Sequence, residues 1–137
     1  MKAQVGINGF GRIGRLVTRL ALNDPSRGKI VAINNPDLTL DYLIYLLKYD
    51  SAHGVFSKHA FEKSGNDLLV NGQKIRITTE KDPAKLKWGD LSTDVVMECT
   101  GQFITTEKAE AHLTTKNKKV VMSAPPKDET PMFVYGV

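Results

Sequence analysis

Apolar residues along the chain follow two spacings. The first is a short continuous run, typical of strands buried on both faces of a parallel sheet, and it occurs at residues 4–8, 29–34, 94–98 and 119–122. The second is a recurrence at every third or fourth position, which predicts helices over residues 12–22, 38–47 and 106–113. Strands that alternate with helices predict an α/β fold.

The middle of the chain has a different pattern. Gly65-Asn66 and Asn71-Gly72 are residue types that permit the positive backbone angles of tight hairpins. They separate three short strand-like segments, at residues 60–63, 68–70 and 74–78. The pattern predicts an antiparallel meander inserted into a Rossmann-type, doubly wound, mostly parallel sheet. No repeat, low-complexity tract or linker interrupts the sequence, so we expect one domain.

A glycine-rich segment follows the first predicted strand. Gly9 allows a tight turn, Gly11 lets the backbone approach a pyrophosphate, and Gly14 lets the helix pack closely on the strand. Free N–H groups at the start of the helix face an anion. The second strand ends at Asn34-Asn35, about 20 residues on, where a ribose-binding side chain belongs. Residues 1–137 are therefore predicted to form a dinucleotide-binding domain, the alternative being a glycine-rich turn in an unrelated α/β protein.

Small and polar residues follow the predicted parallel strands. The carboxyl ends of such strands lie along one edge of the sheet, here called the rim, where open α/β sheets bind ligands. The residues brought to the rim are Asn8-Gly9, Asn34-Asn35, Thr100-Gly101 and Ser123-Ala124. We expect a cofactor to bind across these four strand ends.

Composition and charge narrow the class of protein. With 137 residues, of which 41% are hydrophobic and 25% charged, the chain can bury a core. The net charge of +4 is modest and the basic residues are scattered, so we expect no specific nucleic-acid partner. The one basic run, Lys116-Asn117-Lys118-Lys119, follows a predicted helix and is expected to be a solvated terminus that favours the negative end of that helix.

Cysteine use and apolar content indicate the compartment. The single cysteine cannot form an internal disulfide, which suits a reducing compartment. The start of the chain lacks an apolar export segment, and no stretch approaches the roughly 18 apolar residues of a membrane span. We expect a cytoplasmic protein without a membrane partner. His59 and His112 lack other ligands at metal-binding spacing, which predicts surface or capping residues and no metal site.

Several segments closely resemble one enzyme family. The run from Val5 to Leu16 resembles the amino-terminal strand, turn and helix of phosphorylating glyceraldehyde-3-phosphate dehydrogenase. Later segments resemble landmarks of the same family in the same order, and the last resembles its next strand: Val31-Ala32-Ile33-Asn34, Lys48-Tyr49-Asp50-Ser51-Ala52-His53-Gly54, Lys87-Trp88-Gly89, Glu98-Cys99-Thr100-Gly101, Ser123-Ala124-Pro125 and Pro131-Met132-Phe133-Val134-Tyr135-Gly136-Val137. The resemblance covers the whole chain and implies NAD as the cofactor.

The resemblance also implies which residues contact that cofactor. Arg12 and Ile13 are expected to use backbone N–H groups, and Lys81 matches a position next to the adenine, although it is equally expected as a solvated surface lysine. Thr100, Gly101 and Phe103 match family positions beside the adenine and the phosphates, and Ser123 and Ala124 match positions nearer the nicotinamide ribose. The predicted cofactor-binding residues are Asn8, Gly9, Phe10, Gly11, Arg12, Ile13, Asn35, Pro36, Lys81, Thr100, Gly101, Phe103, Ser123 and Ala124.

Asn35 is where the sequence departs most from the family pattern. Family members typically have aspartate here, whose carboxylate accepts bonds from both ribose hydroxyls and repels a 2′-phosphate. Asparagine keeps one acceptor without the charge, so NADP becomes a possible cofactor besides NAD. Asp37 could restore negative potential, or it could serve as a turn or helix-cap residue.

We predict no catalytic residue within the chain. The family nucleophile lies in a Cys-Thr-Thr-Asn type segment after the last predicted strand, with its histidine base further on, and neither occurs in the sequence. Cys99 matches a position that commonly holds serine and is expected to be small and partly buried. Asp50, Asp94 and Glu98 have no recognisable acid–base partner. Trp88 is expected to pack in the interior.

The resemblance implies an activity for the complete enzyme. A cysteine thiolate attacks the aldehyde, hydride passes to the nicotinamide, and phosphate releases the product 1,3-bisphosphoglycerate, a step of glycolysis. The chain would supply the cofactor-binding half, either as part of a longer protein or as a naturally short chain. The catalytic substrate domain is then absent, and the complete enzyme is expected to be a homotetramer. The alternatives are an erythrose-4-phosphate dehydrogenase-like domain and a non-catalytic NAD-binding or interaction module.

Overall fold

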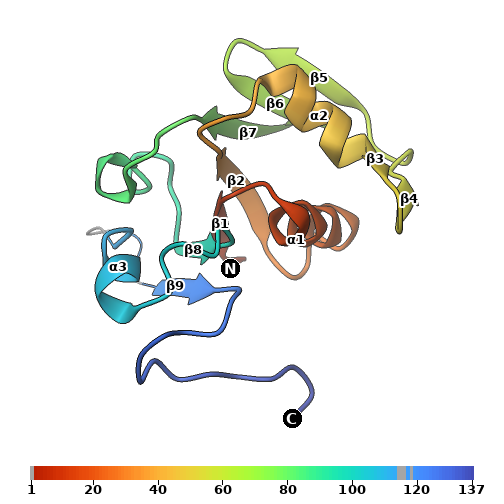
Figure 1. Cartoon of the computed structure of the whole chain (residues 1–137). Helices are drawn as coiled ribbons and strands as arrows, with labels where there is room; N and C mark the ends of the chain where they lie inside the picture. Colours follow the sequence, from red (N-terminus) through yellow and green to blue (C-terminus); the bar gives the residue numbers. More distant parts are fainter. Residues whose placement is uncertain (1, 114–116, 118) are drawn as a thin grey trace.

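The centre of the molecule is a seven-stranded sheet (Figure 1). The computed structural model describes residues 2–113, 117 and 119–137. The strand order is β5-β6-β7-β2-β1-β8-β9, with bounds β1 Gln4–Asn8, β2 Lys29–Asn34, β5 Phe61–Ser64, β6 Asp67–Val70, β7 Gln73–Thr78, β8 Val95–Glu98 and β9 Lys119–Met122. Strands β7, β2, β1, β8 and β9 pair in parallel, whereas β5, β6 and β7 pair antiparallel. The predicted α/β sheet with an inserted antiparallel meander is confirmed.

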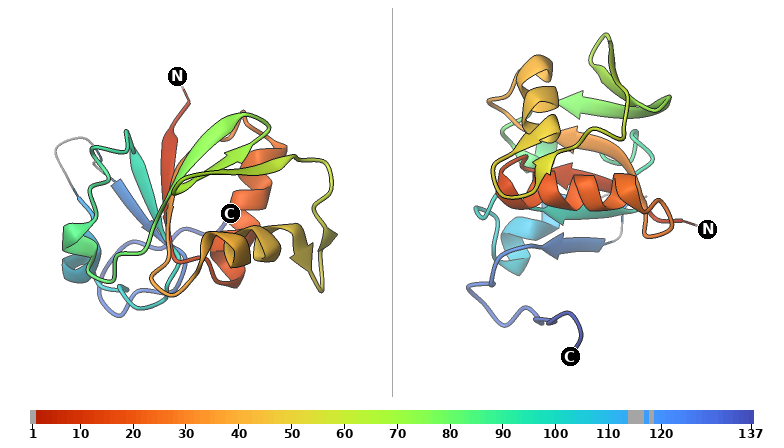
Figure 2. Two further views of the ribbon diagram at one scale, coloured as in Figure 1. Left: turned by 90° about the horizontal axis from the view of Figure 1, so that it is seen from above. Right: turned by 90° about the vertical axis from the view of Figure 1, so that its right-hand side faces the viewer.

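Both faces of the sheet are covered, by different structures. Helices α1 (Arg12–Asn23) and α2 (Leu40–Lys48) lie on one face, while the 3-10 turn η1 (Pro83–Lys85) and helix α3 (Thr106–Glu110) lie on the other side (Figure 2). Successive side chains of a strand point to opposite faces, which explains why neighbouring residues of β2 enter different cores. Ile33 packs in the core beneath α1 and α2, and Ala32 packs with Trp88 on the other face.

The larger core lies between the sheet and the two long helices. Leu43 and Leu47 of α2 are fully buried there, and Ile7 of β1 and Ile33 of β2 meet them from the sheet. Burial of one such side chain contributes about 1.5–3 kcal/mol of hydrophobic free energy. The helices are therefore fixed to the sheet by apolar packing, which sets where their first turns lie. In the residues that the structure describes, no helix is long and apolar enough to cross a membrane.

The hairpin turn between β6 and β7 follows the sequence prediction. Asn71 has φ 50° and Gly72 has φ 80°, so both central residues adopt the left-handed conformation that two-residue hairpin turns require. The turn places Val70 opposite Gln73 and fixes the register of the two strands. This meander attaches to the parallel sheet through β7, which pairs with β2.

Two local predictions were wrong, and one small sheet was not expected. Helix α3 ends at Glu110 and not at residue 113, because His112 and Leu113 donate their N–H groups three residues back, to Ala109 and Glu110, which tightens and terminates the helix. The segment expected as a last strand, residues 131–137, forms no strand, and its apolar side chains are exposed. A two-stranded sheet of β3 (Tyr49–Asp50) and β4 (Gly54–Val55) was not expected. The expected role of Lys116 and Lys118 lies outside the described residues.

Candidate cofactor-binding site

The turn between β1 and α1 depends on two glycines in contact. Gly9 has φ +94°, a conformation that residues with a Cβ rarely adopt. A Cβ on Gly14 would lie 2.0 Å from the carbonyl oxygen of Gly9, so only glycine lets α1 start this close to the end of β1. A Cβ on Gly9 would also lie 2.9 Å from the backbone nitrogen of Thr100. The loops after β1 and β8 therefore approach each other closely at the rim.

Helix α1 begins without a side-chain cap. Its N-cap residue is Gly11, which has no side chain to accept a hydrogen bond from the first turn, and that turn contains no acidic residue. The first N–H groups of a helix have no partner within the helix, and together they carry a partial positive charge. An added Cβ at Gly11 would meet no atom within 4 Å. The start of α1 thus combines unused donors with open space, an arrangement suited to an anion.

A hollow of about 260 Å³ lies at the rim beside this turn. We call it the rim hollow, and its lining comes from the loops after β1, β2, β7 and β8. It is lined by Asn8, Gly9, Gly11, Asn35, Pro36, Asp37, Glu80, Lys81, Cys99, Thr100, Gln102 and Phe103. Eight of the residues expected to bind the cofactor are in this lining, which is the arrangement that a ligand bound across several strand ends requires.

The other six expected residues do not line the rim hollow. Phe10 is buried in the core, and the side chain of Ile13 is half exposed on α1. Gly101 follows Thr100 with φ 73°. Ser123 and Ala124, after β9, line a separate hollow of about 380 Å³ together with residues of the carboxyl-terminal segment. The structure therefore groups the residues expected around the adenosine and separates them from those expected around the nicotinamide.

The side chain of Arg12 points to a different partner. Its guanidinium donates to both carboxylate oxygens of Asp50, at 2.7 and 3.3 Å. The Asp50 carboxylate also accepts hydrogen bonds from the backbone N–H groups of His53 and Ala52. These bonds, led by the one from His53, hold the pKa of Asp50 well below its usual range against the effect of burial. The ion pair ties the first turn of α1 to the β3–β4 hairpin.

Asn35 is oriented by the glycine turn. Its Oδ1 accepts a hydrogen bond from the backbone N–H of Phe10 at 2.9 Å, and its own N–H donates to the carbonyl of Thr78. The remaining amide nitrogen, Nδ2, has no partner in the described part of the chain. Because Asn35 lines the rim hollow, this side chain offers two N–H donors there, where an aspartate would offer an acceptor.

Lys81 and Asp37 face the same hollow from opposite loops. Their side chains are largely exposed, and the Lys81 Nζ lies 3.9 Å from the Asp37 Oδ1. An exposed pair at this distance contributes about 0–1 kcal/mol. Asp37 lies in the turn between β2 and α2, which is one of its two expected local roles. Thr39 caps α2 by accepting a hydrogen bond from the N–H of Tyr42, so the other expected role of Asp37, as a helix cap, was wrong.

The environment of Cys99 does not activate its thiol as a nucleophile. The residue is partly buried, as expected from the sequence. Burial raises the pKa of the Cys99 thiol to about 11, and the nearby Glu98 carboxylate acts in the same direction. Only a thiolate is a good nucleophile, so Cys99 is not suited to attack an aldehyde.

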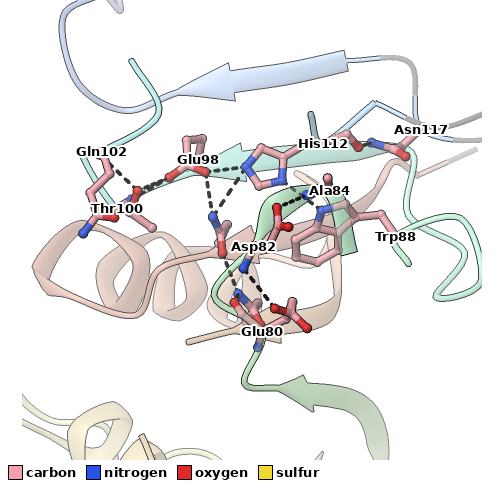
Figure 3. A network of polar contacts seen from close by, with 11 residues as sticks. Glu80, Asp82, Ala84, Trp88, Glu98, Thr100, Gln102, His112 and Asn117 are labelled. Carbon is pink, nitrogen blue, oxygen red and sulfur yellow. Dashed lines mark hydrogen bonds and ion pairs between the residues drawn. The ribbon is translucent and has the colours of Figure 1, made fainter. Parts of the chain in front are cut away.

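A buried polar cluster beneath the rim was missed by the sequence analysis. His112, expected as a surface or capping residue, is fully buried, and its Nε2 lies 2.5 Å from Oε2 of Glu98 (Figure 3). Glu98, expected to have no acid–base partner, therefore has one. Burial alone would raise the pKa of Glu98, but hydrogen bonds from His112, Asn8 and Thr100 outweigh it and lower the pKa. No local pattern in the sequence places His112 beside Glu98, because the two residues are 14 positions apart.

These features define the class of protein. A mostly parallel sheet, covered on both faces and carrying a glycine turn at the end of its first strand, is the architecture of a dinucleotide-binding domain. The family model "Glyceraldehyde 3-phosphate dehydrogenase, NAD binding domain" matches residues 3–106. The chain belongs to this family.

Curated relatives resemble the chain over nearly its full length. It is 56% identical to glyceraldehyde-3-phosphate dehydrogenase A of Escherichia coli (strain K12), over 99% of this chain and 40% of that protein. It is 55% identical to glyceraldehyde-3-phosphate dehydrogenase of Bacteroides fragilis, over 98% of this chain and 40% of that protein. Identity to glyceraldehyde-3-phosphate dehydrogenase 2 of Trichoderma koningii is 52%, over 98% of this chain and 39% of that protein. The chain thus spans about 40% of the length of these relatives.

Proposed function

We propose that residues 1–137 are the cofactor-binding part of a glycolytic, NAD-dependent glyceraldehyde-3-phosphate dehydrogenase. The observation that carries the proposal is the uncapped start of α1, which opens onto the rim hollow at Gly11. Membership of the NAD-binding-domain family supports the same conclusion. The first-turn N–H groups of α1 would bind the pyrophosphate, and the open space at Gly11 would admit it.

The lining of the rim hollow suits the adenosine half of the dinucleotide. Asn35 would donate to the ribose, and Lys81 and Phe103 would flank the adenine. The nicotinamide end would extend toward Ser123 and Ala124, which lie at the end of the neighbouring strand β9. All of these assignments use positions after parallel strands, where such sheets bind nucleotides.

The orientation of Asn35 supports NADP as a second cofactor. Since its Oδ1 is bonded to Phe10, the group left for a ligand is an N–H donor, which can bind a hydroxyl or a phosphate oxygen equally. A 2′-phosphate would meet no carboxylate at this residue. Asp37 and Glu80 also line the hollow, and no arginine follows Asn35 directly, so we expect NAD to remain preferred.

Aldehyde oxidation requires groups that we assign to a separate catalytic domain. The family reaction needs a cysteine thiolate and a histidine base, and the only thiol of the chain, Cys99, has a raised pKa. The nicotinamide supplies the hydride chemistry when it is bound, and this chain positions it. We further propose that the complete enzyme is a homotetramer in the cytoplasm, as the family resemblance implies.

Calorimetric titration of the chain with NAD and with ADP-ribose tests the binding site. We expect weak binding with similar affinities for the two ligands, because the chain supplies the adenosine half of the site. Absence of binding by both ligands at millimolar concentration would refute the proposal.

An activity assay tests whether aldehyde oxidation requires the separate catalytic domain. With glyceraldehyde 3-phosphate, NAD and phosphate, the pure chain should produce no NADH. Turnover that persists in the pure chain and disappears in Cys99→Ala would overturn the assignment of Cys99.

A further inference from the structure

We propose that Glu98 and His112 are positioning residues, which set the geometry of the adenosine site without touching the ligand. The inference rests on the proposed cofactor-binding function. Both residues are essentially inaccessible to solvent and lie behind the rim hollow, not in its lining. They reach the hollow through hydrogen bonds to residues that do line it.

The polar cluster forms one continuous chain of hydrogen bonds (Figure 3). On one side, the indole N–H of Trp88 donates to His112 Nδ1 at 3.1 Å, and His112 Nε2 contacts Glu98 Oε2. On the other side, the Asn8 amide nitrogen donates to Glu98 Oε2 at 2.7 Å, and the Asn34 amide nitrogen donates to Asn8 Oδ1 at 2.8 Å. The chain thus crosses the carboxyl ends of three adjacent strands, β8, β1 and β2.

The partners fix the tautomer of His112. An indole N–H can only donate, so Nδ1 of His112 must be an unprotonated acceptor. The ring proton is therefore on Nε2, where it is donated to the Glu98 carboxylate. If Nδ1 also carried a proton, its N–H would point at the indole N–H of Trp88, and the two donors would repel each other. The contact with Glu98 is accordingly a hydrogen bond from a singly protonated imidazole and not an ion pair.

The carboxylate of Glu98 is the acceptor at the centre of this hydrogen-bond network. Its Oε2 accepts from His112 and Asn8, and its Oε1 accepts from both the backbone N–H and the hydroxyl of Thr100, at 2.9 and 2.5 Å. Trp88 donates to His112 and Asn34 donates to Asn8, and these two acceptors in turn donate to Glu98, so no member can reverse its direction without opposing two donors or two acceptors. The network has a single satisfied arrangement, which makes it a rigid support.

Two loops that line the rim hollow are held by this support. Thr100 is bound to Glu98 and in turn accepts a hydrogen bond from the N–H of Gln102, which fixes the turn after β8. Asn34 binds both backbone groups of Glu80, donating to its carbonyl and accepting from its N–H, each at 2.8 Å. Thr100 and Glu80 both line the hollow, so the buried network connects two parts of its lining.

A matched pair of substitutions separates positioning from general stability. His112→Gln places an amide N–H near the Nε2 position and keeps the bond to Glu98, whereas His112→Asn places an oxygen near Nδ1 and keeps the bond to Trp88. Each variant loses one buried hydrogen bond, so we expect similar falls in melting temperature. Only His112→Asn should weaken ADP-ribose binding, by about tenfold.

Equal weakening in both variants, or unchanged affinity in His112→Asn, would overturn the proposal. If the wild-type chain binds neither NAD nor ADP-ribose, the proposed function itself fails, and this outcome is distinct from equal weakening in a chain that binds.

Nuclear magnetic resonance of the wild type tests the network without any variant. At pH 7 the ring nitrogens of His112 should show a proton on Nε2 and none on Nδ1, and any other protonation pattern would refute the arrangement. Trp88 is the only tryptophan, so its indole N–H gives one assignable signal. This signal should shift on addition of ADP-ribose, although Trp88 does not line the hollow. An indole signal that stays fixed while Thr100 shifts would contradict the coupling.

Discussion

Helices α1 and α2 both begin just after a strand reaches the rim, yet their first turns differ. Helix α2 is complete in itself: Thr39 caps it by accepting from the N–H of Tyr42, and Asp41 lies in its first turn. Helix α1 has Gly11 as its N-cap residue and therefore lacks a capping side chain, and its first turn contains no acidic residue. The two starts show that a helix end can serve stability or ligand binding, because the same N–H groups cannot satisfy a side chain and an anion at once.

The difference extends to how each helix is positioned. Helix α2 is fixed by buried leucines, whereas the approach of α1 to β1 depends on the absence of a side chain at Gly14. Sequence changes at the start of α1 should therefore separate into those that affect folding and those that affect binding. At the start of α2 only stability should change.

Gly14→Ala should have the largest effect on folding. The added Cβ would lie 2.0 Å from the Gly9 carbonyl oxygen, and because that atom belongs to the backbone, α1 must move away from β1. We expect the free energy of unfolding to fall by about 3 kcal/mol or more. Urea unfolding followed by circular dichroism measures this, and a stability equal to wild type would mean that the turn is looser than the structure shows.

Gly11→Val should abolish ligand binding but have little effect on folding. A valine at this position meets no protein atom within 4 Å of its Cβ, so stability should change by about 1 kcal/mol at most. Its side chain would occupy the space that the pyrophosphate needs, so ADP-ribose binding should become undetectable by calorimetry. Wild-type affinity in a folded Gly11→Val chain would show that the phosphates bind elsewhere.

Asn35→Asp should change the preference between NAD and NADP, with a smaller effect on binding than Gly11→Val. The new carboxylate can keep the bond to the N–H of Phe10 and offer its second oxygen to the ribose hydroxyls. NAD binding should strengthen by about 1 kcal/mol, and NADP binding should weaken because a carboxylate would face the 2′-phosphate. Paired titrations of both chains with both cofactors measure the ratio. An unchanged ratio would mean that residue 35 does not contact the ribose.

Thr39→Ala should affect α2 alone. Loss of the cap exposes an unsatisfied N–H at Tyr42 and should lower the free energy of unfolding by about 0.5–1 kcal/mol. The affinity for ADP-ribose, measured on the same samples, should stay unchanged because Thr39 does not line the rim hollow. A parallel loss of affinity would show that the two helix starts are coupled.

Local sequence patterns predicted the elements whose own residues carry a clear signal. Strands β2 and β9 have the expected bounds, because each contains a continuous apolar run and pairs in parallel with a neighbour, although β9 is an edge strand and only partly buried. The glycine turn was also predictable, since Gly9 has a positive φ that other residues rarely adopt and Gly14 leaves no room for a side chain. Strands β3 and β4, of two residues each, are too short to show any periodicity.

The polar cluster could not be predicted from local patterns. His112 is buried by Trp88 and Glu98, which are 24 and 14 residues away in the sequence. Such contacts depend on the completed packing of the loop after β7 against the segment after α3. For the same reason the sequence identified Asn35 as a candidate ribose ligand but gave no indication that Phe10 fixes which end of its amide faces the hollow.

The two outer strands of the sheet differ in a way that bears on solubility. Strand β5 exposes Glu62 and Lys63, and charged edge strands resist pairing with another chain. Strand β9, the opposite edge, exposes Val121, and the segment beside it exposes Phe133 and Tyr135. We therefore expect any aggregation of this chain to begin at the β9 edge, because the charged β5 edge disfavours pairing. Light scattering should show less aggregation for Val121→Lys than for wild type.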